Sequence, residues 1–306
     1  MTTSVALCTY NGEKYLAEQL DSILSQEIAV DEIIACDDGS SDGTWDILNR
    51  YHQEFPSIIK IYRNTENMSF IKNFESAIKK CSNEIIFLSD QDDIWKPSKV
   101  GTVLHYFENN LDKQAVFHDT DLLENGEILS FGNWHSIFYQ PSNPHGISLF
   151  HYLIFLGNVV TGASFAFRNQ NKNWNFNSSS ILLLHDYQMA LHYATKNALG
   201  IIHDSLSIYR LHEGQQVGTH LNNRQKRKEA YDKFVNSSLR QKIKFYESKS
   251  QSWKNKLHAS DEEKIQQFIE KEIEILKEKQ LENSPFILRM GIIFYRAITK
   301  KIKAKT

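Results

Sequence analysis

The first 120 residues alternate short apolar runs with segments in which apolar residues recur every three or four positions. Short apolar runs bounded by polar residues are typical of buried strands, and the longer periodic segments are typical of amphipathic helices. This alternation indicates βαβ units, so we expect an α/β fold with a mostly parallel sheet and helices on both faces. The expected strands are Val5–Cys8, Ile33–Cys36, Ile58–Tyr62 and Ile85–Leu88.

The pattern becomes less regular after residue 114. Asn125-Gly126 lies between apolar residues and is a hairpin turn signal, and Val159–Phe167 is strand-like with Gly162 inside it. From about residue 222 to residue 279 the chain is charged and helix-prone. We therefore predict one α/β domain over residues 1–220 and a helical C-terminal extension over residues 221–306.

Polar residues follow three of the expected strands at the point where each strand ends. In α/β sheets of this kind, ligands bind beyond the carboxyl ends of the strands. We therefore expect the active site at this edge, the alternative being a set of solvated loops. The three segments are Thr9-Tyr10-Asn11-Gly12, Asp37-Asp38-Gly39-Ser40-Ser41-Asp42-Gly43-Thr44 and Ser89-Asp90-Gln91-Asp92-Asp93.

The triplet Asp90-Gln91-Asp92 stands directly after a buried strand. Two carboxylates at that spacing point the same way on an extended backbone, and Mg²⁺ or Mn²⁺ prefers such oxygen ligands. The alternative is a helix-capping cluster before Trp95. The sequence has neither a Gly-x-x-x-x-Gly-Lys-Ser/Thr nor a Gly-x-Gly-x-x-Gly segment, which disfavours P-loop nucleotidases and NAD enzymes.

One segment of the sequence also matches a motif of serine hydrolases. Gly39-Ser40-Ser41-Asp42-Gly43 fits the nucleophile elbow of serine hydrolases, with Asp186 and His212 following in the appropriate order. Two features oppose a nucleophilic Ser41. Little sheet precedes the motif, and the adjacent Asp37-Asp38 would disfavour an anionic intermediate.

Taken together, five ordered motifs over residues 2–218 resemble family 2 glycosyltransferases, in particular the bacterial rhamnosyltransferase-like branch that builds surface polysaccharides such as O-antigens. The resemblance implies a GT-A fold, a nucleoside-diphosphate sugar donor, a divalent cofactor (Mn²⁺ or Mg²⁺) and inversion at the anomeric carbon. The motifs are Cys8-Thr9-Tyr10-Asn11-Gly12, Asp37 to Thr44, Ser89 to Pro97, His185-Asp186-Tyr187 and Tyr209-Arg210-Leu211-His212-Glu213.

On the donor side, the resemblance implies that Thr9, Tyr10 and Asn11 line the nucleobase pocket. Asp38 matches the carboxylate that reads the base, and a carboxylate can accept a hydrogen bond from the N3–H of uracil or thymine. Lys72 resembles the basic donor-side position of the family, although a solvated helix face explains it equally well.

On the reaction side, Asp90 matches a nucleotide-sugar-binding carboxylate, and Asp92 matches the metal ligand. His212 resembles a histidine that completes the metal site, with an ordinary loop histidine as the alternative. Asp186 matches the general base, with a helix N-cap as the alternative. At Tyr187 many members of the family have a tryptophan. We therefore expect the part of the site that contacts the acceptor to differ from theirs.

The net charge of −2 combines two unlike parts. Residues 1–220 contain 14 Lys and Arg against 26 Asp and Glu, whereas residues 221–306 contain 21 against 11. Residues 285–305 end in a lysine cluster and predict a helix in the interface of an anionic membrane. A terminal helix packed on its own domain is the alternative. The basic extension lacks an aromatic stacking series, so we expect no nucleic-acid partner.

The three cysteines have no metal-ligand spacing, and the N-terminus does not resemble a signal peptide. We therefore expect a cytoplasmic protein, peripheral on the inner face of the membrane. Its predicted function is inverting transfer of a sugar from dTDP-rhamnose or a UDP-hexose to a growing, polyprenyl-diphosphate-linked glycan. The alternatives are a non-catalytic glycan-binding module on the same fold and the Ser41 hydrolase.

Overall fold

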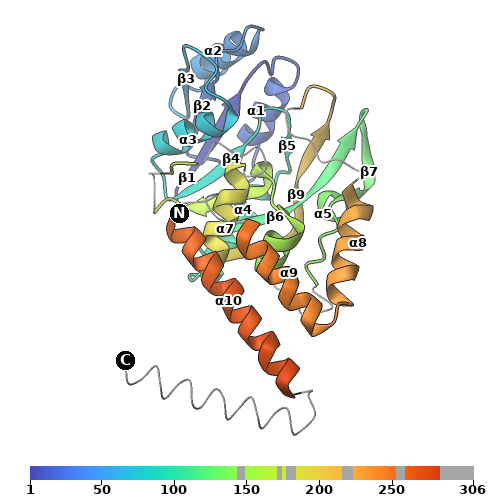
Figure 1. Cartoon of the computed structure of the whole chain (residues 1–306). Coiled ribbons are helices and arrows are strands. Elements are labelled where there is room, and N and C mark those ends of the chain that lie inside the picture. The colour runs from blue at the N-terminus through green and yellow to red at the C-terminus, as the bar shows by residue number, and fades with distance from the viewer. Residues whose placement is uncertain (143–148, 171–173, 177–183, 216–222, 253–258, 283–306) are drawn as a thin grey trace. The chain divides into compact units, whose positions relative to one another are not determined.

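A computed structural model describes residues 1–142, 149–170, 174–176, 184–215, 223–252 and 259–282 (Figure 1). The chain divides into two compact units, Met1–Glu229 and Ala230–Thr306. The boundary that we expected at residue 220 falls in a segment outside the described residues.

The first unit is built on a nine-stranded sheet with the order β3-β2-β1-β4-β8-β6-β9-β5, and β7 pairs with β6. The first four strands are parallel to one another and coincide with the four expected strands. The strands are β1 (Thr3–Thr9), β2 (Glu32–Asp37), β3 (Ile59–Arg63), β4 (Ile85–Ser89), β5 (Ile94–Trp95), β6 (Ala115–Glu124), β7 (Glu127–Gly132), β8 (Phe165–Arg168) and β9 (Leu199–Leu211).

Beyond β4 the sheet is mixed rather than parallel. β8 is antiparallel to both β4 and β6, whereas β6 runs parallel to β9. The hairpin turn at Asn125-Gly126 joins β6 to β7, and both residues have positive φ, as a two-residue hairpin requires. The expected strand Val159–Phe167 is wrong in its first half, because Gly162–Ser164 form a 3₁₀ turn before β8.

Helices cover both faces of the parallel strands. Val5, Leu7, Ile33 and Ala35 share one buried cluster with residues of α1, α2 and α4. Alternate strand residues point to the opposite face, and α3 contacts β1 and β2 without joining that cluster. The helices are α1 (Leu16–Leu24), α2 (Thr44–Glu54), α3 (Phe70–Lys80), α4 (Lys99–Asn109), α5 (Asn133–Ser136), α6 (Leu149–His151), a π-helical turn (Tyr152–Leu156) and α7 (His185–Thr195).

The C-terminal part is helical, as the sequence predicts. It contains α8 (Asn223–Val235), α9 (Leu239–Ser252) and α10 (Ala259–Glu282), and α9 packs against α10. Among the described helices, none has the length and apolar character needed to cross a bilayer. The predicted interfacial helix at 285–305 lies outside the described residues.

Candidate active site

The loops after β1, β2 and β4 are joined at the carboxyl edge of the sheet, because these three strands are neighbours. The Tyr10 N–H donates to Gln91 Oε1 at 2.8 Å, and Gln91 Nε2 donates back to the Tyr10 carbonyl at 2.9 Å. Asn11, at φ 49°, accepts from the Ser41 N–H at 2.9 Å. Thr9 Oγ1 donates to Asp37 Oδ1 at 3.1 Å. The predicted gathering of polar loops at this edge is therefore confirmed.

Asp38 is buried and held in one orientation. Its Oδ1 atom accepts from Asn64 Nδ2 at 2.8 Å and from the Met68 N–H at 2.9 Å. Asn64 is itself fixed, since its Nδ2 also lies 3.1 Å from Asn73 Oδ1. Asn64 and Met68 therefore both donate to Oδ1, and Oδ2 takes part in neither bond.

A buried lysine, Lys99, lies within electrostatic range of Asp93 and Asp90 in the acidic motif after β4. Asp93 is buried, and its Oδ2 atom has no hydrogen-bond partner among the described residues. Lys99 is also buried, donates to the Ala163 carbonyl at 2.7 Å, and lies 3.9 Å from the centre of the Trp95 ring. Burial lowers the pKa of Lys99 to about 7, against the charges of Asp93 and Asp90, which raise it.

Asp90 is half-buried, and withdrawal from water raises its pKa to about 8. The nearby charges of Asp92 and Asp186 add to this increase, whereas Lys99 opposes it. The same loop is tied to β9 by Arg210, whose Nε donates to the Asp92 carbonyl at 3.0 Å. An opposite charge placed between these carboxylates would stabilise their ionised forms, so the site favours a cation.

Asp92 and His212, the two predicted metal ligands, are in contact, with 2.9 Å between Asp92 Oδ2 and His212 Nε2. Neighbouring ligands of an octahedral cation at about 2.1 Å lie about 3 Å apart, so the pair fits Mn²⁺ or Mg²⁺. No group of three His, Cys, Asp or Glu side chains among the described residues is arranged to hold a metal ion. The remaining ligands would therefore come from water and from a bound phosphate.

Asp186 is buried in the first turn of α7. Burial raises its pKa to about 7, against hydrogen bonds from the Tyr187 N–H, the Asn158 side chain and the Gly162 N–H. A carboxylate with a pKa near neutrality accepts a proton more readily than an exposed one. The chain therefore holds a potential general base beside the acidic motif.

His185, the residue before Asp186, also lies close to Gly162 and Asp90. A Cβ atom at Gly162 would lie 3.2 Å from His185 Nε2 and 3.5 Å from Asp90 Oδ2. The imidazole stacks on Phe74 with 4.0 Å between ring centroids. Burial lowers its pKa to about 3, so the ring is neutral.

Two other predicted features lie apart from these contacts. Lys72 on α3 pairs with Glu75 Oε2 at 2.9 Å and reaches Asn175 Oδ1 at 3.4 Å, so the structure does not join it to the acidic residues. Ser41 Oγ donates to Asn11 Oδ1 at 3.3 Å, and His212 contacts Asp92 instead. The described contacts therefore do not assemble a Ser-His-Asp triad around Ser41.

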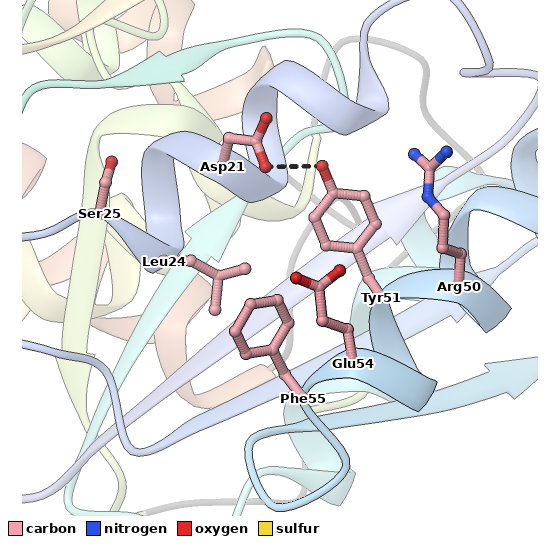
Figure 2. Close-up of a pocket in the computed structure, with 7 residues that line it drawn as sticks. All are labelled: Asp21, Leu24, Ser25, Arg50, Tyr51, Glu54 and Phe55. Carbon is pink, nitrogen blue, oxygen red and sulfur yellow. Dashed lines mark hydrogen bonds between the residues drawn. The ribbon is translucent and has the colours of Figure 1, made fainter.

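A surface pocket of about 500 Å³ lies elsewhere, between the C-terminal halves of α1 and α2. Figure 2 shows that the hydrogen bond from Tyr51 to Asp21 crosses from one helix to the other. A helix that follows a parallel strand returns toward the amino ends of the strands. This pocket is therefore at the opposite edge from the acidic residues and is not part of the candidate site.

Residues 4–127 match the model of the glycosyl transferase family 2. This part of the chain is a family 2 glycosyltransferase domain. The dTDP-rhamnosyl transferase RfbG of Shigella flexneri is 27% identical over 70% of this chain and 74% of its own length. The putative glycosyltransferase EpsE of Bacillus subtilis is 32% identical over 37% of this chain, and the matched part is 41% of its length. A Nostoc glycosyltransferase of unassigned activity is 28% identical, with 39% of its length matched.

Solved structures show that the family 2 domain has the expected GT-A fold. Staphylococcus aureus TarS 1–349, crystallised with UDP-GlcNAc, has a TM-score of 0.57 and 17% identity over 89% of this chain and 72% of its own. The mannosyltransferase PcManGT from Pyrobaculum calidifontis, crystallised with GDP-Man and Mn²⁺, has a TM-score of 0.52 and 14% identity. That match covers 97% of this chain and 79% of PcManGT.

Three residues of the site were not singled out from the sequence of the domain: Asp93, Lys99 and His185. Lys99 had a detectable signal, because it shares the apolar stripe of α4 with Val103 and Phe107 at four-residue spacing. A lysine on a core-facing stripe is unusual unless it is paired. His185 and Asp93 lie within motifs that carry the family resemblance, but the sequence assigned no role to either of them.

Proposed function

We propose that this chain transfers a sugar from a nucleoside-diphosphate sugar to a hydroxyl group of a growing glycan, with inversion at the anomeric carbon. The proposal rests chiefly on Asp186, a buried carboxylate whose pKa is raised to about 7 and which stands beside an acidic, cation-favouring loop. Family 2 membership of residues 4–127 supports it independently.

In this proposal the nucleoside binds at the edge formed by β1 and β2. Asp38 accepts a hydrogen bond from the base through the carboxylate oxygen that faces away from Asn64 and Met68. Tyr10, Asn11 and Thr9 form the wall beside it, and Tyr10 is 38% exposed, which leaves its ring accessible for stacking on the base.

The diphosphate lies over Asp90 and Asp92. Mn²⁺ or Mg²⁺, when bound, would neutralise the negative charge that develops on the leaving nucleoside diphosphate. Asp92 and His212 would hold the ion, because their contacting atoms are already at the spacing of neighbouring ligands. We place Lys72 at the edge of this region as a donor-side cation.

Asp186 removes the proton from the acceptor hydroxyl. The hydroxyl oxygen then attacks the anomeric carbon from the face opposite the diphosphate, a new C–O bond forms, and the bond to the diphosphate breaks. The hydrogen bonds from Tyr187, Asn158 and Gly162 fix the carboxylate for this step. One base suffices for a single displacement, which yields inversion.

The donor that we favour is dTDP-rhamnose, with UDP-hexoses as the alternative. Support comes from the dTDP-rhamnosyl transferase RfbG, whose match extends through most of both chains. We further propose a polyprenyl-diphosphate-linked acceptor for a surface glycan such as an O-antigen. The domain over residues 1–220 would carry the chemistry, and the basic extension would hold the protein on the inner face of the membrane.

A donor panel with Mn²⁺ tests the proposal. Purified chain is incubated with dTDP-rhamnose, UDP-glucose or UDP-galactose, and release of nucleoside diphosphate is measured with and without a glycan acceptor. We expect Asp186→Asn to lower the rate by at least about 10³-fold with nucleotide affinity nearly unchanged, because only the base is removed.

The control variant is Asp112→Asn, an exposed aspartate paired with Lys113, which should retain the wild-type rate. Full transfer by Asp186→Asn would overturn the assignment of the base. Binding of donor and glycan without any release of nucleoside diphosphate would instead favour a non-catalytic glycan-binding module.

A further inference from the structure

The imidazole of His185 is a buried polar group without a hydrogen-bond partner among the described residues. Its side chain belongs to a residue that is 5% exposed, and neither Nδ1 nor Nε2 has a hydrogen-bond partner among the described residues. Buried polar groups are almost always paired, and an unpaired one costs stability. A bound ligand is one explanation for a group of this kind.

The surroundings of the ring on its packed side are apolar. Phe74 stacks on it, and the rings of Phe70 and Phe176 have centroids 6.2 Å and 6.1 Å away. These contacts fix the plane of the imidazole without using its nitrogens. Among the described residues the ring is therefore oriented by packing, and both of its nitrogens have no hydrogen-bond partner there.

The Nε2 atom of the ring lies close to Gly162 and to the proposed catalytic residues. His185 Nε2 and Asp90 Oδ2 both approach Gly162, and the Gly162 N–H donates to Asp186. A side chain at Gly162 would crowd both of these polar atoms, so glycine leaves more room beside them. Three groups that could touch one small ligand thus meet at the first turn of α7.

The chemistry of these groups selects the type of ligand. A neutral imidazole donates from one nitrogen and accepts at the other, and Asp90 and Asp186 are carboxyl groups. A phosphate would meet carboxylates without a positive partner from His185. A hydroxyl group can both donate to a carboxylate and accept from an imidazole N–H.

We propose that His185 is a specificity-determining residue that hydrogen-bonds a hydroxyl of the donor sugar, in the corner between Gly162, Asp90 and Phe74. This inference rests on the proposed function and adds to it a residue that selects the sugar. The hydroxyl completes the hydrogen bonding of His185 only when a sugar is bound, so His185 discriminates the nucleotide sugar from the nucleotide alone.

The test compares wild type with His185→Phe, which keeps the aromatic stack on Phe74 and removes both nitrogens. The probes are the best donor of the panel above and the matching free UDP or dTDP, each titrated with Mn²⁺. We expect the affinity for the nucleotide sugar to fall about ten-fold while the affinity for the free nucleotide stays within about two-fold.

Thermal unfolding of the ligand-free chains gives a second readout. Because His185→Phe removes an unpaired buried polar group, we expect its Tm to rise by about 2–4 °C. A purely structural histidine predicts a lower Tm. The control is His105→Phe on the exposed side of α4, which should change neither the affinities nor their ratio.

Equal loss of affinity for the sugar nucleotide and for the free nucleotide would overturn the inference, as would unchanged affinity for both. An ordered water molecule bound to the ring would give the second of these results. If the wild-type chain binds no nucleotide sugar of the panel, the proposed function fails before the role of His185 is tested. The two failures are therefore distinguishable.

Discussion

At the scale of single residues, the site is defined by charged groups that are taken out of water. Asp93 and Lys99 are each 1% exposed, and Asp186 is 6% exposed. Ionised groups in such surroundings are costly unless they are paired, which is why their pKa values move toward the neutral forms. Residue chemistry therefore predicts measurable pH effects.

The raised pKa of Asp186 links stability to pH. Its folded pKa of about 7 lies above the usual value near 4, so between these pH values the folded chain binds more protons than the unfolded one. The contribution of Asp186 to stability is then most favourable below pH 4 and is lost as the pH rises to 7.

We expect Asp186→Asn to be more stable than wild type above pH 7, by roughly 2–4 kcal/mol. The advantage should shrink toward zero as the pH falls to 4, because the wild-type carboxyl group becomes neutral. Urea unfolding at pH 5, 6, 7 and 8 measures this. A stability difference that is independent of pH would contradict the assigned pKa.

At the scale of elements, the site depends on how α4 meets the turn before β8. Lys99, the first residue of α4, donates to the Ala163 carbonyl, and the neighbouring Gly162 N–H donates to Asp186. The helix thus positions the backbone that orients the base, and it brings positive charge to the loop after β4. One side chain performs both tasks.

We expect Lys99→Met to lower the free energy of unfolding by about 1–3 kcal/mol, because it leaves the buried Ala163 carbonyl without its donor and removes the amino group whose charge acts on Asp90 and Asp93. Urea unfolding provides the measurement. Lys113→Met is the control, since Lys113 pairs with the exposed Asp112 and such surface pairs contribute at most about 1 kcal/mol.

The double variant Lys99→Met/Asp93→Asn tests whether the charge of Lys99 acting on Asp93 contributes to this loss of stability. Removal of one buried carboxylate should recover part of the lost stability, because less uncompensated charge remains in the core. An effect of Lys99→Met no larger than that of Lys113→Met would show that the contacts of Lys99 do not stabilise this part of the fold.

At the scale of the whole molecule, charge divides along the sequence. The first 220 residues are acidic in balance and contain every residue of the candidate site, whereas the last 86 are basic. A basic C-terminal segment is attracted to anionic lipid, with about 1 kcal/mol for each Lys or Arg near the surface. This asymmetry underlies the proposal of a membrane-bound acceptor.

We expect the full chain to co-sediment with vesicles that contain phosphatidylglycerol, and a chain ending at residue 282 to do so much less. Binding should weaken with added salt, because screening reduces attraction between exposed charges. Vesicles of phosphatidylcholine alone serve as the control. Equal binding by the two chains would exclude residues 283–306 as the attachment segment.

The sequence by itself determined the four parallel strands, the gathering of polar loops at their carboxyl edge and the hairpin at Asn125-Gly126. These features depend on local periodicity and turn chemistry, which a single sequence displays. It also singled out Asp38, Asp90, Asp92, Asp186 and His212 as candidates, through their positions in motifs. Their catalytic and binding roles remain predictions.

Only the tertiary structure decided the second half of the sheet and the groups that support the site. The antiparallel position of β8, the 3₁₀ turn at Gly162 and the hydrogen bond from Lys99 to the Ala163 carbonyl depend on contacts between residues far apart in the chain. Burial is likewise a property of the folded molecule, and it raises the pKa of Asp186 and keeps the nitrogens of His185, which have no hydrogen-bond partner among the described residues, away from water. The residue types determine which chemistry is available, and three-dimensional packing determines which of those residues can act together.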